Sequence, residues 1–146
     1  MNWQKDDFTI TTDKSKMDID VIHGYLSRSY WAQGVPRATI QKSIEGALCF
    51  AVLHGNRQVG FARVITDKAT FGYLSDVFIL EEYRGKGLSK WLMEIILGHP
   101  ELQNFRRFLL STRDAHGLYR RFGFNEVVSP ENWMQIYNPE VYKTNS

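Results

Sequence analysis

Apolar and polar positions follow two different periods along the chain, and the clearest change between them lies in residues 73–98. Residues 73–80 are mostly β-branched, aromatic or aliphatic, which is typical of a buried strand. After a short polar turn, apolar side chains recur at i, i+3, i+4, i+7 and i+8, the stripe of an amphipathic helix. This stripe consists of Leu88, Trp91, Leu92, Ile95 and Ile96. The pattern therefore predicts a strand, a turn and a helix that Gly98 and Pro100 terminate.

The same two periods divide the rest of the chain into further strands and helices. Apolar runs predict strands at residues 8–12, 48–53, 59–66, 73–80, 107–111, 124–128 and 133–137. Helices are predicted after a capping box at Ser15-x-x-Asp18, from Pro36 to Gly46, over residues 88–97, and between Asp114 and Gly123. Turn residues at 54–57 join two of the strands into a hairpin. The last residues, 143–146, are polar and are expected to fray.

The order of these elements predicts the fold class. A strand, a helix and a strand in succession imply a parallel pair joined by a right-handed crossover. We therefore expect an α/β (α+β) fold with a mixed, mostly antiparallel sheet of about seven strands, flanked by about four helices. The chain has 146 residues and no internal repeat or linker, so a single domain over residues 1–146 is expected.

The turn Arg84-Gly85-Lys86-Gly87 has the chemistry of an anion site. The first amides of the following helix have no partner within the helix and lie at the positive end of its dipole. The glycines let the backbone approach a ligand closely, and Lys90 adds further positive charge. The turn matches neither the P-loop nor the dinucleotide fingerprint. The alternative is a solvated basic turn that binds nothing.

This turn and a second motif resemble the signatures of the GNAT superfamily of N-acetyltransferases. Residues 84–89 (Arg-Gly-Lys-Gly-Leu-Ser) are similar to the family's acetyl-CoA signature, Gln/Arg-x-x-Gly-x-Gly/Ala, with Ser89 at the last position. Residues 114–124 resemble the family's Asn-x-x-x-x-Leu-Tyr-x-x-x-Gly-Phe, with Asp114 near the usual asparagine. The element order over residues 8–137 also looks like the GNAT fold. The resemblance implies that the fourth and fifth strands form the parallel pair and splay apart.

The resemblance implies a path for acetyl-CoA as the acyl donor. The pantetheine amides would pair with the free strand edge at Val77, Phe78 and Ile79. The diphosphate would lie on the turn and the helix start, which comprise Arg84, Gly85, Lys86, Gly87, Leu88, Ser89 and Lys90. Asp114 stands where the family asparagine approaches the pantetheine arm.

The resemblance also implies catalytic roles. Tyr119 matches the family tyrosine that protonates the departing thiolate as general acid; the alternative is a tyrosine that only packs on the sheet. The free amide of Phe78 or Ile79 is our hypothesis for the oxyanion donor. Asp76 is a candidate base, because an amine must lose a proton to attack. The alternative is a carboxylate paired with Arg63 or Arg113 for structural reasons.

The acceptor site in this family usually lies beneath the loop between the first two helices. Here that loop carries Tyr30 and Trp31, which with Arg63, Tyr73 and Asp76 would form an aromatic, mixed-charge pocket. Trp31 as a core residue and Arg63 as a solvated strand residue are the alternatives. The function expected is acetyl transfer to a primary amine of a small molecule or peptide by direct attack in a ternary complex. The alternative is a catalytically silent acyl-CoA-binding or regulatory module.

The composition of the chain bears on which partners and metals it is expected to bind. The net charge is only +2, which argues against nucleic-acid binding despite a pI of about 8.7. Cys49 lies in an apolar run and is expected to be a buried thiol. The histidines show no metal-ligand spacing, so no metal is proposed. Without a signal peptide or an apolar run of about 20 residues, the chain is expected in the cytoplasm, with no membrane partner. A homodimer is expected because dimers are common among relatives.

Overall fold

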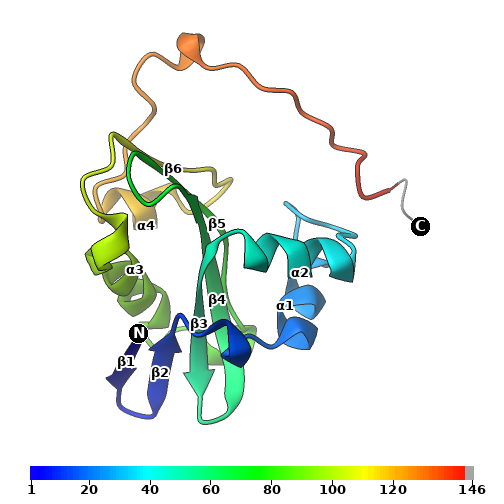
Figure 1. Cartoon of the computed structure of the whole chain (residues 1–146), viewed down its shortest axis with the longest axis vertical. Coiled ribbons are helices and arrows are strands. Elements are labelled where there is room, and N and C mark those ends of the chain that lie inside the picture. Colours follow the sequence, from blue (N-terminus) through cyan, green and yellow to red (C-terminus); the bar gives the residue numbers. More distant parts are fainter. Residues whose placement is uncertain (144–146) are drawn as a thin grey trace.

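The computed structural model describes residues 1–143 and shows one sheet with helices on both faces (Figure 1). The strands are β1 (Asn2–Lys5), β2 (Phe8–Thr11), β3 (Leu48–His54), β4 (Arg57–Thr66), β5 (Phe71–Ile79) and β6 (Arg107–Leu110). The α-helices are α1 (Ile19–Leu26), α2 (Arg37–Glu45), α3 (Leu88–Gly98) and α4 (His116–Arg120). Short 3-10 turns lie at η1 (Lys14–Lys16), η2 (Glu81–Tyr83), η3 (Pro100–Leu102) and η4 (Pro130–Asn132). Of residues 143–146, which were predicted to fray, 144–146 lie outside the described residues.

The sheet confirms the predicted fold class. The spatial order is β1-β2-β3-β4-β5-β6, and all neighbours are antiparallel except β5 and β6. The crossover between these two parallel strands contains α3, as a parallel connection requires. The unpredicted strand β1 pairs with β2 and shifts the count, so the parallel pair is the fifth and sixth strand rather than the fourth and fifth.

Two apolar clusters fill the two faces of the sheet. On one face α3 packs against β3, β4 and β5, and the fully buried residues there include Leu92 and Ile96. On the other face α1 and α2 cover Phe61 and Phe78. Figure 1 shows these helix layers on opposite sides of the strands. The apolar stripes predicted from sequence are therefore the faces that pack on the sheet.

Strand β5 separates from β6 halfway along its length. Pairing between them ends at Leu74↔Leu110, whereas β5 continues to Ile79 and stays paired with β4. At the same point the β4–β5 register shifts, and Asp76 adopts a left-handed φ of 57°. A bulge of this kind bends a strand and increases its local twist. The second half of β5 thus has one edge that no strand of the described chain occupies.

Three sequence predictions are wrong in detail. Asp18, not Ser15, caps α1, and its carboxylate accepts hydrogen bonds from the amides of Asp20 and Val21. Asp114 does not cap α4, whose N-cap is Ala115 and has no side-chain bond. Residues 124–128 and 133–137 have strand-like patterns but pair with no strand. A strand pattern describes side chains only, and a strand also needs a partner for its backbone groups.

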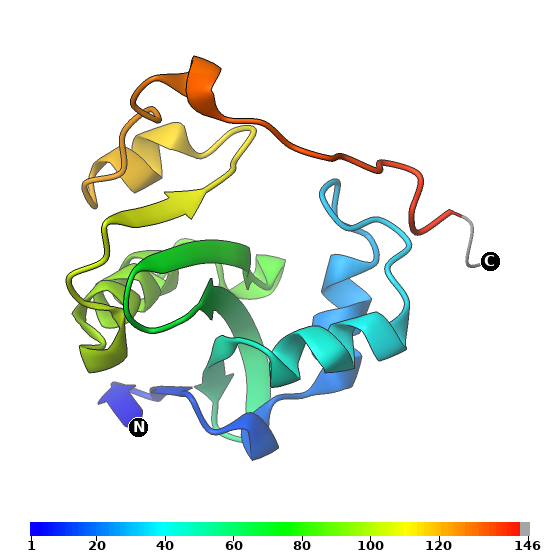
Figure 2. The ribbon, with the colours of Figure 1, turned by 45° about the horizontal axis from the view of Figure 1, so that its top comes forward.

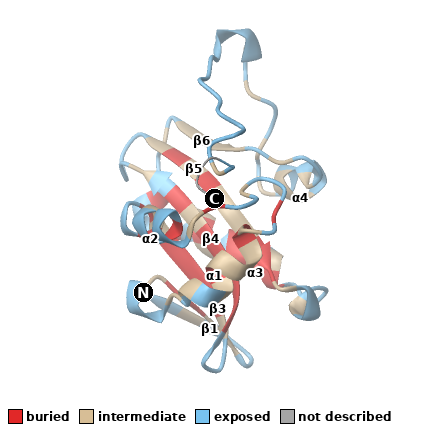
Figure 3. Ribbon diagram, turned by 90° about the vertical axis from the view of Figure 1, so that its right-hand side faces the viewer, coloured by how far each residue is buried: buried red, intermediate tan, exposed pale blue. Residues whose placement is uncertain are grey.

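The C-terminal arm, residues 124–143, leaves the body of the fold. It starts beside α4, passes η4 and crosses towards the loop between α1 and α2 (Figure 2). Exposure coloring shows it almost entirely as exposed chain, in contrast to the buried central strands (Figure 3). No helix of the described chain has the length and apolar character that a membrane crossing requires.

Candidate active site

A cavity of about 1230 Å³ lies where β5 separates from β6. Its walls come from α1, the α1–α2 loop, α2, β4, the second half of β5, the β6–α4 connection and the C-terminal arm. Ligands of open sheets bind at the carboxyl ends of strands, where neighbouring strands diverge. This cavity is therefore the candidate site.

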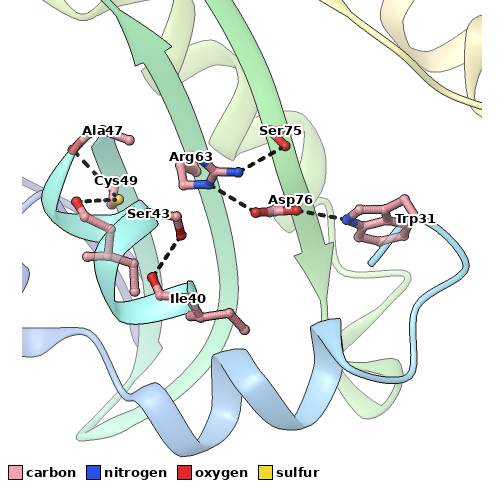
Figure 4. Close-up of polar contacts among 9 residues, drawn as sticks. Trp31, Ile40, Ser43, Ala47, Cys49, Arg63, Ser75 and Asp76 are labelled. Carbon is pink, nitrogen blue, oxygen red and sulfur yellow. Dashed lines mark hydrogen bonds and ion pairs between the residues drawn. The ribbon is translucent and has the colours of Figure 1, made fainter. Parts of the chain in front are cut away.

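Asp76 is the centre of a polar network on the β5 wall (Figure 4). One carboxylate oxygen accepts from Arg63 Nε at 2.9 Å, and the other accepts from Trp31 Nε1 at 2.8 Å. The side chains of Arg63 and Asp76 are only 15% and 10% exposed, so this is a largely desolvated ion pair. Asn and Asp tolerate the left-handed conformation better than other residues, which explains how Asp76 occupies the bulge. The network fixes Trp31 against β5.

Aromatic rings extend from this network across the cavity. Tyr25 stacks on Phe78 with ring centroids 4.1 Å apart, and Trp31 contacts both Tyr25 and Tyr30. The Tyr30 hydroxyl accepts the backbone N–H of Arg113 at 3.1 Å. The Arg113 guanidinium lies 3.8 Å from the centre of the Tyr30 ring. The α1–α2 loop is thereby connected to the chain that follows β6, on the far side of the opening.

Tyr119, from α4, lines the same cavity as Asp76. Its ring packs against the α3-side cluster and meets Phe124 edge-on at 6.0 Å between centroids. Burial raises the pKa of Tyr119 above its ordinary value of 10.0, and the nearby Tyr30 and Asp114 act in the same direction. The phenol therefore keeps its proton at neutral pH and is able to donate it.

The predicted anion turn has the expected backbone geometry. Gly85 and Gly87 have left-handed φ values of 80° and 78°, which side chains disfavour. Gly87 is the N-cap of α3. Because glycine has no side chain to accept a hydrogen bond, the first amides of α3 are not capped by this residue. Arg84 is used within the fold, because its Nε donates to the Ile79 carbonyl and its Nη2 to the Tyr25 hydroxyl. The guanidinium therefore fastens the end of β5 to α1.

The structure brings most of the predicted site residues together, in two groups. The cavity wall includes Tyr30, Trp31, Arg63, Tyr73, Asp76, Val77, Arg84, Asp114 and Tyr119. The turn and helix start from Gly85 to Lys90 do not line the cavity, and the side chains of Phe78 and Ile79 are buried in the core.

Sequence reasoning missed many residues of the wall, among them Tyr25, Arg28, Tyr137 and Tyr142. Tyr25 follows the buried Ile22 by three residues and precedes the buried Leu26 by one, so its spacing indicates a core position rather than a site residue. The two C-terminal tyrosines reach the cavity only because the arm crosses it.

Metal binding and a reactive thiol are two further chemistries that the described side chains bear on. In the described part of the chain, no three His, Cys, Asp or Glu side chains are grouped closely enough to hold a metal ion. Cys49 is fully buried, as predicted, and burial raises its pKa to about 11. A thiol of that pKa carries almost no thiolate at neutral pH, so Cys49 is not a nucleophile.

Comparisons with known proteins agree with this geometry. Residues 45–126 match the model of the acetyltransferase (GNAT) domain family. A crystal structure from Xanthomonas campestris pv. campestris, assigned to the GNAT family, has a TM-score of 0.91 and 49% identity, over 92% of this chain and 96% of that one. A protein of Gibberella zeae, provisionally named an acetyltransferase, is 32% identical over 142 residues, 81% of this chain and 78% of that protein.

A more distant structure adds information about the fold. A Clostridium acetobutylicum protein, solved with acetyl-CoA, has a TM-score of 0.66 over 89% of this chain and 96% of that one, at 12% identity. At that identity the likeness concerns the fold alone. The family match covers more than half of the chain, and the Gibberella relative covers most of it at over 30% identity. This chain belongs to the GNAT family of acetyltransferases.

Proposed function

We propose that the protein is an acetyl-CoA-dependent N-acetyltransferase that acetylates a primary amine of a small molecule or peptide by direct attack in a ternary complex. The observation that carries this proposal is the free edge of β5 beyond Leu74, which borders the same cavity as Tyr119. GNAT structures with bound acetyl-CoA support the choice of cosubstrate.

The donor would bind mainly through backbone groups. Val77, Phe78 and Ile79 lie on the part of β5 that has no β6 partner, so their outward backbone groups would pair with the pantetheine amides, except the Ile79 carbonyl, which already accepts from Arg84 Nε. The diphosphate would lie at the α3 N-terminus, over Gly85 and Gly87, where the amides of Leu88, Ser89 and Lys90 point outward. Lys86 and Lys90 are exposed and would add positive charge. Asp114 lines the cavity near the pantetheine path.

The reaction would proceed in one displacement. The neutral amine attacks the thioester carbonyl carbon, a C–N bond forms, and the C–S bond breaks. A free β5 amide, at Phe78 or Ile79, would stabilise the oxyanion. Tyr119 would give its proton to the CoA thiolate, a role suited to a phenol that stays protonated at neutral pH. The amine's proton would pass to Asp76, directly or through water, since an ionised carboxylate has about four acceptor positions and only two are used here.

The acceptor would bind between the α1–α2 loop and β5. Tyr30, Trp31 and Tyr73 line this part of the cavity together with the Arg63–Asp76 pair. Aromatic faces attract ammonium groups, which suits an amine that arrives protonated. The aromatic surface also favours an acceptor with an apolar or planar portion.

One observation favours a second candidate, a catalytically silent acyl-CoA-binding or regulatory module. Both oxygens of Asp76 already accept hydrogen bonds within the protein, as expected if its role is structural. Such a module would bind acetyl-CoA and leave amines unmodified.

Two measurements test the proposal. Acetyl-CoA should raise the melting temperature, because a ligand that binds only the folded state stabilises it. Thiol release from acetyl-CoA should then be followed across a panel of small amines and peptide amines. Binding together with amine-dependent release supports the enzyme. Binding without release from any amine supports the silent module, and no binding would contradict both.

A further inference from the structure

The cavity wall contains four arginines, and Arg113 is used differently from the other three. The side chains of Arg28, Arg63 and Arg84 each donate at least one hydrogen bond to an acceptor within the fold. In the described part of the chain, the Arg113 guanidinium forms no hydrogen bond and no ion pair, and it contacts the fold through the ring of Tyr30. A guanidinium has five N–H donors. Arg113 therefore has donors on the cavity wall that the protein itself does not use.

Tyr30 holds Arg113 at two points. The Tyr30 hydroxyl accepts the backbone N–H of Arg113 at 3.1 Å, and the guanidinium lies over the Tyr30 ring, 3.8 Å from its centre. A cation over an aromatic face is attracted by the π-system, which leaves its N–H groups able to bind another acceptor. Because the side chain is already placed, less conformational freedom is lost when a ligand binds to it.

No carboxylate of the described chain neutralises Arg113. The sequence left Arg113 open as a partner of Asp76. In the structure the two oxygens of Asp76 accept from Arg63 and Trp31 instead. Asp114 follows Arg113 in the sequence, yet no ion pair joins the two side chains within the described residues. Since a guanidinium binds a carboxylate through two parallel hydrogen bonds, a carboxylate of a ligand is the partner that fits this position.

The charge of the whole wall favours a ligand that carries both signs. The four arginines of the wall are matched by four carboxylates, and the wall has no lysine, so its formal net charge is zero. A zwitterion with one ammonium and one carboxylate would leave this balance unchanged. A phosphate group would add a charge of about −1.5 to −2. The balance therefore favours a carboxylate over a phosphate.

Two aromatic side chains connect Arg113 to Asp76. Trp31 donates to Asp76 at 2.8 Å and meets the Tyr30 ring edge-on, with centroids 5.1 Å apart. Tyr30 in turn contacts the Arg113 guanidinium. The candidate base and the unpaired guanidinium thus lie at the two ends of one aromatic surface. An acceptor that extends across these rings would bring its amine to Asp76 and a carboxylate to Arg113.

We propose that the acceptor is an amino-acid-like molecule, a primary amine that also carries a carboxylate, and that Arg113 binds this carboxylate. The inference rests on the proposed function, because the amine of this molecule is the group that would be acetylated. An amine without a carboxylate would leave the guanidinium unpaired and should bind less tightly. Arg113 would determine specificity and take no part in the chemical step.

Calorimetric titration of the full chain, with and without CoA, tests the carboxylate. The probes are the standard L-amino acids and linear ω-amino acids, each paired with its amide, which keeps the amine and lacks the negative charge. We expect at least one acid to bind about tenfold or more tightly than its amide. Equal affinities in every pair, or no binding of any acid, would overturn the proposal. Titration needs no turnover, so an acid that binds in preference to its amide without thiol release would contradict the proposed acetyl transfer alone.

Substitution of Arg113 tests whether this residue binds the carboxylate. In Arg113→Gln, the preference for the acid over its amide should fall to within about twofold, while Arg113→Lys should keep part of it, because lysine retains the charge without the planar fork. In kinetics, Arg113→Gln should raise the KM of the acid about tenfold and leave kcat close to that of the wild type. Arg106→Gln is the matched control, since Arg106 is exposed and lies outside the cavity wall, and the full preference should persist. A full preference for the acid in Arg113→Gln would overturn the assignment.

Discussion

The proposed site has a donor end and an acceptor end, and the residues proposed for them are arranged in different ways. The donor end consists of residues 77–79 and 84–90, which are nearly contiguous in sequence, and it would bind mainly through backbone groups. The acceptor end consists of Tyr30, Trp31, Arg63, Tyr73 and Asp76, which come from a loop and two strands and act through side chains. Backbone recognition requires only a conformation, whereas the acceptor end requires particular side chains at particular places.

This difference separates the expected effects of substitutions. A change at the donor end should alter acetyl-CoA affinity and leave the acceptor's KM unaffected. A change at the acceptor end should alter turnover or the acceptor's KM while acetyl-CoA still binds. Tyr119 lines the cavity and belongs to neither set of residues, so as the proposed acid it is expected to affect the chemical step alone.

Tyr119→Phe should have the largest effect, a fall in turnover of about 10²–10⁴-fold, because the departing thiolate loses its acid. The dissociation constant for acetyl-CoA should stay within about twofold, since the ring remains. Because the pKa of Tyr119 is raised above 10.0, its proton is lost only above that pH. In the wild type, any loss of turnover from this group should therefore appear above pH 10. Steady-state kinetics and calorimetric titration measure the two effects.

Tyr83→Phe is the control for this change. Tyr83 also loses a hydroxyl, one that lies 3.0 Å from His54 Nδ1 and outside the cavity wall. Turnover should remain close to that of the wild type. Unchanged turnover in Tyr119→Phe, with acetyl-CoA still bound, would leave Tyr119 as a packing residue.

Asp76→Asn should lower turnover about 10²-fold if Asp76 accepts the amine's proton. Asn tolerates the left-handed φ of 57° at this position, so the bulge should persist while the charge is removed. The partly buried Arg63 loses its counter-ion, which should destabilise the fold by about 2 kcal/mol. Turnover is measured against pH, and stability by urea unfolding.

The exposed pair of Asp20 and Arg37 provides the control for Asp76. Asp20→Asn should cost at most about 1 kcal/mol, because exposed ion pairs contribute little. If Asp76→Asn lowers stability but leaves turnover and its pH profile unchanged, Asp76 is a structural residue and the proton has another acceptor.

Gly87→Ala should weaken acetyl-CoA binding about tenfold, equivalent to 1.4 kcal/mol. A Cβ at Gly87 meets no atom within 4 Å, so the change adds no clash within the protein. The left-handed φ of 78° should nevertheless cost about 1–2 kcal/mol and disturb the amides that follow. Gly98→Ala is the control, because it also meets no atom and has no positive φ. Equal acetyl-CoA affinity in both variants would show that the diphosphate does not bind at this turn.

The same contrast explains what sequence could predict. The anion turn and α3 were predictable, because their signal lies in consecutive residues: glycines at 85 and 87, then an apolar stripe. The Arg63–Asp76 pairing was named only as one of several alternatives, since sequence does not show which arginine faces a carboxylate across a bulge. Tyr25 was missed as a wall residue because its spacing also fits a core position.

The strand predictions differ for a related reason. Residues 107–110 became β6 because the crossover through α3 places them beside β5. Residues 124–128 and 133–137 have similar patterns, yet no strand of the described chain lies beside them. Side-chain alternation predicts which segments are able to form strands, and the tertiary fold decides which of them find a partner.

Trp31→Phe should have the smallest effect and would sharpen the definition of the acceptor end. Phenylalanine retains an aromatic ring but loses the Nε1–H that donates to Asp76 at 2.8 Å. The lost bond should cost about 1 kcal/mol, seen as a several-fold rise in the acceptor's KM. Affinity for acetyl-CoA should not change, because the contacts of Trp31 described above are with Tyr25, Tyr30 and Asp76 and not with the α3 turn. Tyr73→Phe, which alters a second aromatic residue of the same wall, should add to this effect if both residues contact the acceptor. A loss of acetyl-CoA affinity in Trp31→Phe would mean that the loop between α1 and α2 belongs to the donor end, and the division of the site into two ends would have to be redrawn.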